Sequence, residues 1–350
     1  MSLVLVTGIS GYLGAHVVQQ LVEHGYRVRG TVRSAKLARH KELYKVYGDS
    51  VEVVAVDDLA KGSFTDILEG VTAVIHQASP TPGRAPSVEE ALDGSIDGSL
   101  NILGQAEKAG IKNFSYASSL ISFTLDFSSD RRPVKDDEWL PITREALTDV
   151  ENPNPRLIYA VQNVLSERAV WDFVDKHPHV ELTSINPTYF YGPWAPGYDA
   201  PFAGESFNPK SFLLSSMGLA WGLILPKGAP PPDFFVDVRD VARALVLALK
   251  APPASQVGRK RILLSSDRPQ PSEIIALITQ HRPELLPRLN ERFQAAPDNV
   301  KPFIDIKRAK EVLGLEIIDW KKTILDSVDA LLEMEEAWKA RGKPIEIEKL

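Results

Sequence analysis

A glycine-rich segment near the N-terminus constrains the fold more than any other feature of this 350-residue chain. The segment TGISGYLG (7–14) follows the apolar run LVLVTG (3–8) and precedes apolar residues at helical spacing. Its glycines have the spacing G-x-x-G-x-x-G, one residue longer than the G-x-G-x-x-G pattern of dinucleotide-binding folds. A strand, a tight turn and a helix in this order bring the backbone N–H groups of a helix N-terminus to a pyrophosphate.

The longer spacing does not change what the glycines are needed for. One glycine allows the sharp turn, another lets the backbone approach the anion, and the last lets the helix pack against the strand. We therefore expect this turn to bind a dinucleotide through Gly8, Gly11, Tyr12, Leu13 and Gly14. The alternative is a glycine-rich turn that binds no ligand.

Apolar strands alternate with helical patterns through the first half of the chain. Strands are expected at residues 3–8, 26–32, 51–56, 72–78, 112–119 and 180–186. Helices are expected after the first strand, across residues 99–110 and 157–174, and at the surface over residues 323–342. Strands rich in Val and Ile with helices between them predict an α/β fold of the Rossmann type, a doubly wound parallel sheet covered on both faces.

The pattern loosens after about residue 125, and proline-rich loops such as GPWAPGYDAP (192–201) become frequent. This change predicts a smaller, irregular C-terminal part over the sheet. The expected dinucleotide-binding domain comprises residues 1–186 with parts of 234–265. The expected substrate-binding part comprises residues 187–233 and 266–350.

Composition excludes several classes of function. A formal charge of −6 argues against a general nucleic-acid or membrane-surface binder. The chain has no Cys, which excludes disulfides and thiolate chemistry, and its seven His residues show no metal-ligand spacing. We expect no metal, and His76 at a strand end is expected to be structural. The start of the chain shows no signal peptide and no run is apolar enough to cross a bilayer, so a cytoplasmic location is expected.

The end of the second expected strand indicates which dinucleotide is bound. A preference for NAD usually requires Asp or Glu there to bind the ribose 2′-hydroxyl. Here the strand ends GTVRS, with Arg33 and then Lys36. A guanidinium is suited to a phosphate, so we expect NADP(H). The alternative is that Arg33 is an ordinary solvated side chain.

Several motifs in order resemble the extended short-chain dehydrogenases/reductases: TGISGYLG, Arg33, Asp57-Asp58-Leu59, HQASP, YASS and Tyr159. The chain is most similar to the subgroup of dihydroflavonol reductases, cinnamoyl-CoA reductases and fungal carbonyl or aldehyde reductases. Four longer segments share this resemblance: residues 56–80, INPTYFYGP (185–193), FFVDVRDVARALVLAL (234–249) and DIKRAKEVLGLE (305–316). The resemblance spans almost the whole chain.

The resemblance implies roles for individual residues. Tyr159 would donate a proton to the substrate, and Ser119 would hydrogen-bond the substrate carbonyl, although Ser118 could hold that role instead. The cofactor would be bordered by Asp58, Leu59, Ala78, Ser79, Pro187 and Thr188. The alternatives are a loop pair at Asp57 and Asp58, serines that satisfy backbone at a strand end, and a Tyr159 that packs on the sheet.

One residue departs from the family. The family pairs its Tyr with a Lys four residues later, on the same helix face, but IYAVQNVLSERA (158–169) has Asn163 at that position. The Lys charge would lower the pKa of the Tyr phenol, and a shift from about 10 to about 7 needs roughly 4 kcal/mol. Asn supplies no charge but can hydrogen-bond the ribose. For reduction the neutral phenol is the competent form, so activity is weakened rather than abolished.

The favoured function is therefore an NADPH-dependent reductase of ketones or aldehydes with a modified proton relay. A catalytically weakened NADP-binding sensor or partner protein is the alternative, and a nucleotide-sugar epimerase or dehydratase is less favoured. An apolar pocket would suit a bulky or aromatic carbonyl substrate. Its candidate residues are Ile121, Phe123, Tyr189, Phe190, Trp194, Phe202, Phe207 and Phe212.

Overall fold

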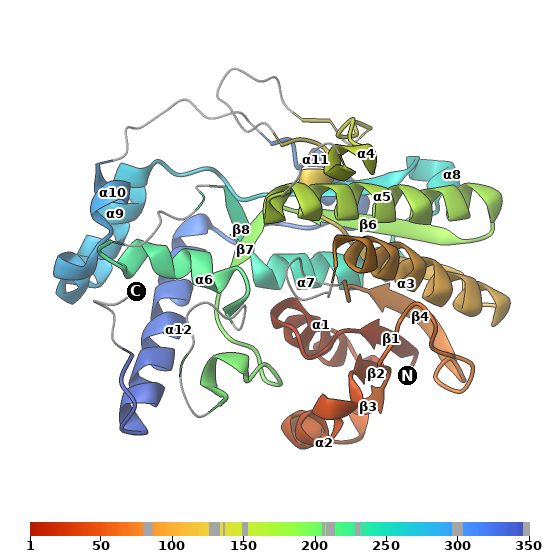
Figure 1. Ribbon diagram of the computed structural model, residues 1–350, viewed down its shortest axis with the longest axis horizontal. Helices are drawn as coiled ribbons and strands as arrows, with labels where there is room; N and C mark the ends of the chain where they lie inside the picture. The colour runs from red at the N-terminus through yellow and green to blue at the C-terminus, as the bar shows by residue number, and fades with distance from the viewer. Residues whose placement is uncertain are drawn as a thin grey trace.

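A computed structural model gives the architecture of the chain (Figure 1). It describes residues 1–350 except 80–86, 126–133, 136, 149–152, 205–206, 208–213, 228–231, 233, 296–303 and 346–350. No helix in the described part of the chain is both long and apolar enough to span a membrane.

The centre of the molecule is a seven-stranded sheet with the order β3-β2-β1-β4-β5-β6-β9, in which every neighbouring pair is parallel. Its strands are β1 (Leu3–Thr7), β2 (Arg27–Val32), β3 (Val51–Ala55), β4 (Val71–His76), β5 (Asn113–Ala117), β6 (Glu181–Pro187) and β9 (Lys260–Leu264). The strand order reverses at β1 and β4. In sheets of this kind, ligands bind beyond the carboxyl ends of the strands at that point.

Helices cover both faces of the sheet. On one face α1 (Tyr12–Glu23) packs beside α7 (Val238–Leu247), and on the other α3 (Val88–Lys108) packs beside α5 (Pro155–Lys176). Strand β1 shows why both faces are covered: Val4 and Val6 belong to the cluster with α1 and α7, whereas Leu3 and Leu5 belong to the cluster with α3 and α5. Side chains of one strand alternate between faces, so an apolar run such as LVLV is buried on both.

The remaining elements are short, apart from the C-terminal helix. Strands β7 (Tyr189–Tyr191) and β8 (Phe235–Asp237) form a small parallel pair. The other α-helices are α2 (Ser34–Leu43), α4 (Glu145–Thr148), α6 (Met217–Ala220), α8 (Ala254–Val257), α9 (Pro271–His281), α10 (Glu291–Gln294), α11 (Lys307–Leu313) and α12 (Trp320–Ala340). The 3₁₀ turns are η1 (Tyr44–Ser50), η2 (Leu120–Ser122), η3 (Ala200–Phe202), η5 (Trp221–Ile224), η6 (Ala248–Lys250) and η7 (Pro283–Arg288).

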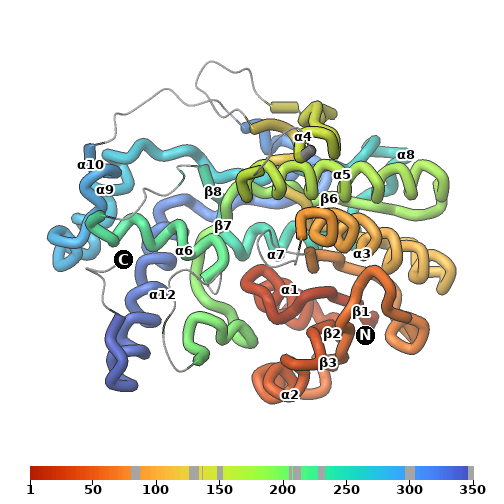
Figure 2. The backbone as a smooth tube through the Cα atoms, in the orientation of Figure 1, coloured from red at the N-terminus to blue at the C-terminus, as the bar shows by residue number. Residues whose placement is uncertain are grey.

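A second apolar core joins these C-terminal elements to the start of the chain. Helix α12 packs against α6, α9 and β8, and Figure 2 shows these green and blue segments together on one side of the sheet. Their cluster includes Trp221, Phe235 and Trp338, and it reaches Tyr12 at the start of α1. The C-terminal part is therefore anchored on the helix that follows the glycine turn.

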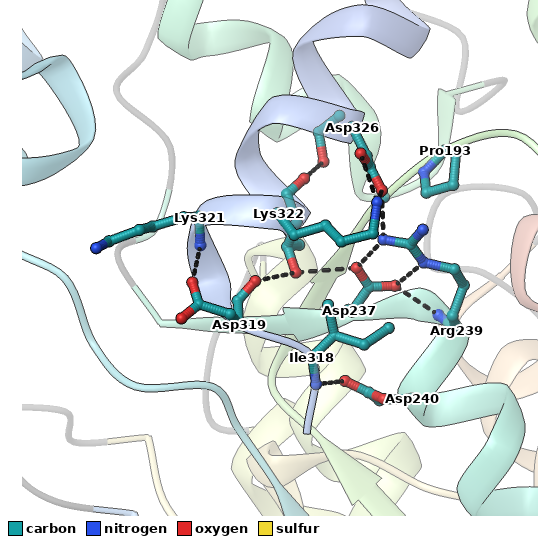
Figure 3. A network of polar contacts seen from close by, with 12 residues as sticks. Pro193, Asp237, Arg239, Asp240, Ile318, Asp319, Lys321, Lys322 and Asp326 are labelled. Carbon is teal, nitrogen blue, oxygen red and sulfur yellow. Dashed lines mark hydrogen bonds and ion pairs between the residues drawn. The ribbon is translucent and has the colours of Figure 1, made fainter. Parts of the chain in front are cut away.

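A polar network fixes α12 at the same junction (Figure 3). Asp237, which is fully buried, caps α7 by accepting from the backbone N–H of Arg239 at 2.9 Å. The Arg239 guanidinium lies 2.6 Å from Asp237 and 2.7 Å from Asp326 of α12. Thr323 of α12 donates at 2.9 Å to the same Asp237 oxygen that the guanidinium contacts at 2.6 Å. One buried carboxylate thus ties the last helix to the edge of β8.

The predicted fold class is confirmed, and all six expected strands are present within two residues of their expected ends. The helix expected across 157–174 is α5, and the surface helix expected over 323–342 is α12, although its inner face is buried. Strand β9, with the sequence KRILL, was not expected.

Candidate active site

The glycine turn between β1 and α1 leaves no space for larger side chains. Gly8 has a φ of 77°, and a Cβ there would lie 3.0 Å from the Ala78 Cβ. A Cβ at Gly14 would lie 2.4 Å from the Gly8 carbonyl oxygen and 2.8 Å from the Ile9 Cα. The contacts at Gly14 are too close for a real side chain, and the positive φ of Gly8 is strained for other residues, so glycine is required for the turn and for the approach of α1 to β1.

The N-terminus of α1 has the properties of an anion site. Gly11 is the N-cap residue, no side chain caps the helix, and its first turn contains no acidic residue. Its first N–H groups are therefore not used by side chains. Beside Gly14, the amide nitrogen and oxygen of Gln77 are buried with no hydrogen-bond partner among the described residues. Orphaned polar atoms beside an uncapped helix fit a pyrophosphate.

Two of the expected turn residues use their side chains elsewhere. The Tyr12 hydroxyl donates to the Gly192 carbonyl at 2.9 Å, and its ring packs near Trp194 and Tyr198. Leu13 packs between the two large apolar clusters. At both positions only the backbone is left for a dinucleotide.

The basic residues expected to bind a ribose phosphate lie at the end of β2. Arg33 is exposed and is the N-cap residue of α2, and Lys36 is exposed in the first turn of that helix. The Lys36 ammonium lies 3.3 Å from the Ser10 hydroxyl of the glycine turn. The nearby Asp57 carboxylate accepts from the backbone and hydroxyl of Ser34, which lowers its pKa, and the Arg33 charge lowers it further. Two positive charges thus flank the start of α2.

The remaining cofactor candidates lie along the carboxyl edge of the sheet. Asp58 accepts from the backbone of Ala60 at 2.8 Å, and Leu59 packs close to Gly98 of α3. Ala78 lies beside Gly8, and Ser79 is exposed and accepts from the Gln162 amide of α5 at 2.7 Å.

The β6 candidates lie farther along the same edge. Pro187 ends β6, and Thr188 follows it with a buried hydroxyl that has no partner among the described residues. Together with the glycine turn and Gln77, this orphaned hydroxyl shows that the residues present fit a dinucleotide along the edge.

Ser119 and Tyr159 come together although they are 40 residues apart in the sequence. Ser119 follows β5 and caps η2 by accepting from the Ile121 N–H at 3.3 Å. Tyr159 lies in the first turns of α5 and is 37% exposed. Although the residue is partly exposed, desolvation of the phenol by the surrounding protein raises its pKa above the ordinary value. Hydrogen bonding from the Ser119 and Asn163 side chains lowers the pKa. At neutral pH the phenol is protonated and can donate.

Asn163 lies one turn after Tyr159 on the same face of α5. Its amide nitrogen donates to the Tyr159 backbone carbonyl at 2.8 Å, so the side chain is turned back along the helix. No cationic group is among the causes of the phenol's shifted pKa. Among the described residues, therefore, no ammonium or guanidinium lowers the pKa of the Tyr159 phenol as the expected Lys would.

The expected pocket residues differ in their surroundings. Ile121 and Phe123 are 8% and 3% exposed and pack in the core. Trp194 donates from its indole nitrogen to the Ala330 carbonyl of α12. Tyr189, by contrast, is 36% exposed, and its phenol is close enough to Tyr159 to raise that residue's pKa.

The other aromatic candidates also pack internally. The partly buried side chains of Phe190, Phe202 and Phe207 join the C-terminal core. Phe212 lies outside the described residues. Tyr189 is thus the expected pocket residue that the structure brings to Tyr159.

Sequence reasoning missed a buried ion pair behind these residues. Glu167 of α5 and Arg261 of β9 are 0% and 1% exposed, and the Arg261 Nε lies 2.9 Å from a Glu167 oxygen. The other Glu167 oxygen accepts from the Ser118 hydroxyl at 2.6 Å. A Glu and an Arg nearly 100 residues apart give no local signal in a sequence.

Comparisons with known proteins show the family to which the chain is similar. The family described as NAD dependent epimerase/dehydratase family matches residues 4–262. A Candida albicans protein, named as a candidate NADPH-dependent methylglyoxal reductase, is 31% identical, with 94% of this chain and 98% of that protein covered. Aldehyde reductase 2 of Sporidiobolus salmonicolor is 31% identical, with 75% and 76% covered.

A solved structure shares the fold over nearly the whole chain. The yeast methylglyoxal/isovaleraldehyde reductase, crystallised with NADPH, superimposes with a TM-score of 0.80. The two sequences are 24% identical, and the match covers 96% of this chain and 99% of the yeast one. The likeness shows the fold.

Proposed function

Because the chain belongs to the NAD dependent epimerase/dehydratase family, we propose that it reduces the carbonyl group of ketones or aldehydes with NADPH as cofactor. Two relatives that are each 31% identical to most of this chain are named as a methylglyoxal reductase and an aldehyde reductase. The resemblance to fungal carbonyl reductases and cinnamoyl-CoA reductases is confirmed.

The chain's own residues account for cofactor binding. When bound, NADPH supplies the hydride that the carbonyl carbon accepts. The uncapped N-terminus of α1 would hold the pyrophosphate, and Arg33 with Lys36 would hold the ribose phosphate. Asp58 and Leu59 would border the adenine, and Thr188 would border the nicotinamide.

The proposal is carried by the meeting of Ser119 and Tyr159 at the end of the cofactor edge. Ser119 donates a hydrogen bond to the carbonyl oxygen, which polarises the C=O bond. Tyr159 transfers its phenolic proton to the same oxygen as negative charge develops there, and solvent then restores that proton. The neutral phenol, whose pKa lies above its ordinary value of about 10, is the form that this reduction needs.

Asn163 is the residue of the proposed site that departs from the family pattern. Asn163 orients the Tyr159 turn through its backbone hydrogen bond and leaves the phenol a weak acid. Asn163 also supports the alternative function as a sensor, because the chain keeps the residues proposed to bind the cofactor but lacks the expected Lys.

Three further predictions concern the rest of the molecule. We propose that residues 1–186 with parts of 234–265 bind the cofactor and that 187–233 and 266–350 shape the substrate pocket. The exposed ring of Tyr189 beside Tyr159 supports a bulky or aromatic substrate. A cytoplasmic location stays a prediction, which microscopy of a fluorescent fusion would test.

One assay separates the candidate functions. The purified protein is mixed with NADPH or NADH and a panel of aryl and aliphatic aldehydes and ketones, and cofactor oxidation is followed by absorbance. We expect the wild type to turn over with NADPH. Arg33→Ala should lower the rate with NADPH but not the rate with NADH. Tight NADPH binding without turnover of any carbonyl would instead support the sensor function. Tightly retained NAD in the purified protein would support an epimerase.

A further inference from the structure

The Glu167 carboxylate is a buried charge that accepts hydrogen bonds from four different residues. It lies on α5, two turns beyond Tyr159, and is 0% exposed. Its Oε1 accepts from the Ser184 hydroxyl at 2.8 Å and from the Arg261 Nε at 2.9 Å. Its Oε2 accepts from the Ser118 hydroxyl at 2.6 Å and from the Asn186 amide at 2.9 Å. Four donors therefore converge on one carboxylate.

These donors come from the end of β5, from β6 and from β9, and the first two strands carry Ser119 and Thr188 at their carboxyl ends. Ser118 is the neighbour of Ser119 and follows β5, while Ser184 and Asn186 belong to β6 just before Thr188. Asn186 also donates to the Ser119 backbone carbonyl at 3.3 Å. Glu167 itself is on the helix that carries Tyr159. One side chain therefore connects the backbone segments of the proposed proton donor, the carbonyl-binding serine and the nicotinamide-side residue.

Arg261 completes this arrangement from β9. Its guanidinium carbon lies 3.6 Å from the centre of the Trp139 ring and 4.0 Å from that of Phe123. The stacked rings leave the guanidinium little freedom to turn away from the carboxylate. Burial alone would raise the pKa of Glu167, but the Arg261 charge and the hydrogen bonds outweigh it, so the pKa is lowered and the carboxylate stays ionised.

A buried ion pair is weak evidence for stability, because desolvation of two charges offsets their attraction. An apolar pair could fill the same volume between α5 and β9, but it would not orient hydroxyl and amide donors from two strands. The number and origin of the donors indicate a geometric role.

We propose that Glu167, held by Arg261, is a positioning residue that sets the placement of Ser119 and Thr188 relative to Tyr159 during carbonyl reduction. This inference rests on the proposed function and adds to it a residue that touches neither substrate nor cofactor. Glu167 acts through Ser118 and Asn186. A displacement of about 1 Å at a reacting group can cost about 100-fold in rate, which is the scale of effect that such a residue controls.

The test is the variant Glu167→Gln. Gln has the same shape but only one acceptor oxygen. Its NH₂ group would face Ser118 and Asn186, which now donate to Glu167. Both side chains would have to rotate and present an oxygen that accepts a hydrogen bond from this NH₂ group. Reversal of Asn186 removes its bond to the Ser119 carbonyl. We expect kcat for NADPH-dependent reduction to fall about 10- to 100-fold. The Kd of NADPH should stay within about twofold of wild type, because the glycine turn is untouched.

Glu181→Gln provides a matched control on the same pair of strands. Glu181 starts β6 and pairs with Lys260 of β9 at 2.6 Å, but at the opposite end of these strands from Ser119. It should lower Tm without changing kcat by more than about twofold. A purely structural role of Glu167 would instead make loss of kcat follow loss of Tm in both variants.

A second pair of variants decides the question should Glu167→Gln fail to fold. Ser118→Ala removes one donor and should lower kcat, whereas Ser118→Thr keeps the hydroxyl and should restore it. Folded Glu167→Gln or Ser118→Ala protein with wild-type kcat would overturn the inference. Absence of turnover in the wild type itself would instead refute the proposed reductase, so the two failures are distinguishable.

Discussion

Single residues carry the chemistry of this site, and they differ in how readily a sequence reveals them. Gly8 and Gly14 were predictable because the turn has no space for other residues, whereas the role of Tyr159 follows from the family resemblance and stays a proposal. Glu167 was not predictable, because a Glu on a helix ordinarily indicates a solvated face. Its role depends on four donors that only the folded chain assembles.

Asn163 gives a prediction at this scale. In Asn163→Lys, an ammonium one turn from Tyr159 should stabilise the phenolate and lower the phenol pKa. Glu167, one turn farther on, is already bonded by four donors and does not need the new charge. We expect kcat for reduction to rise about tenfold at neutral pH, within the range of general acid catalysis.

The pH profile of the same variant gives the sign of the effect. In the wild type, the raised pKa of Tyr159 keeps the phenol protonated, so reduction should persist to above about pH 10. The alkaline decline should move to lower pH in Asn163→Lys and stay in place in Asn163→Gln. Identical profiles for all three proteins would show that position 163 does not act on the phenol.

Among the elements, β9 shows why part of the sheet escaped prediction. Its sequence KRILL begins with Lys260 and Arg261, a pattern expected at a surface, yet both residues are 1% exposed. Each is paired with a carboxylate on a neighbouring element, Glu181 for Lys260 and Glu167 for Arg261. The first six strands were predictable because each contains enough apolar residues to read as a buried run, even where polar side chains such as Ser184 are buried with them.

The packing of α1 on β1 gives a prediction at the scale of elements. Gly14→Ala would place a methyl group 2.4 Å from the Gly8 carbonyl oxygen, so the helix must move away from the strand. We expect a loss of about 1–3 kcal/mol in the free energy of unfolding, as for overpacked cores. NADPH affinity should fall at least tenfold. Gly25→Ala is the control, because Gly25 has a φ of 77° but nothing lies within 4 Å of its added Cβ.

Comparison of the two variants separates the contributions. Gly14 is helical and has no positive φ, so Gly14→Ala adds a steric clash, whereas Gly25→Ala adds backbone strain without a clash. Gly25→Ala should therefore lower stability without weakening NADPH binding. Titration of NADPH fluorescence measures the affinity and urea unfolding the stability. Equal NADPH affinity in wild type and Gly14→Ala would contradict the placement of the dinucleotide at this turn.

For the whole molecule, the doubly wound sheet was predictable and the arrangement of the C-terminal part was not. The sheet follows from regular apolar strands and helices. The position of α12 depends on Asp237, Arg239 and Asp326, whose convergence is set by tertiary contacts (Figure 3). The aromatic residues of the C-terminal part belong mainly to its apolar core. A sequence alone does not distinguish aromatic residues of a core from those that line a pocket.

Two buried histidines make global stability depend on pH. His16 contacts the Pro193 carbonyl and His76 contacts Thr7, and burial lowers the pKa of each to about 4. An unfolded His has a pKa of about 6.5. The neutral ring therefore stabilises the fold fully above pH 6.5, and this stabilisation is lost as pH falls toward 4. Between pH 7.5 and pH 5 each His should cost about 2 kcal/mol of unfolding free energy.

His76→Gln isolates one of these contributions. Burial raises the pKa of Asp240 to about 6, which stabilises the fold as pH falls and opposes the histidines. That effect is common to both proteins and cancels in the comparison. Wild type should lose about 2 kcal/mol more than His76→Gln when urea unfolding is repeated at pH 7.5 and pH 5. Equal losses would contradict a buried, neutral His76.

The most direct test of the central claim is NADPH-dependent reduction of a ketone by Tyr159→Phe, with the Kd of NADPH measured on the same protein. The ring is kept and only the hydroxyl is lost. If Tyr159 gives the proton, kcat falls at least about 100-fold while the Kd of NADPH is unchanged. A Tyr159→Phe protein that reduces the ketone as fast as wild type would contradict the account.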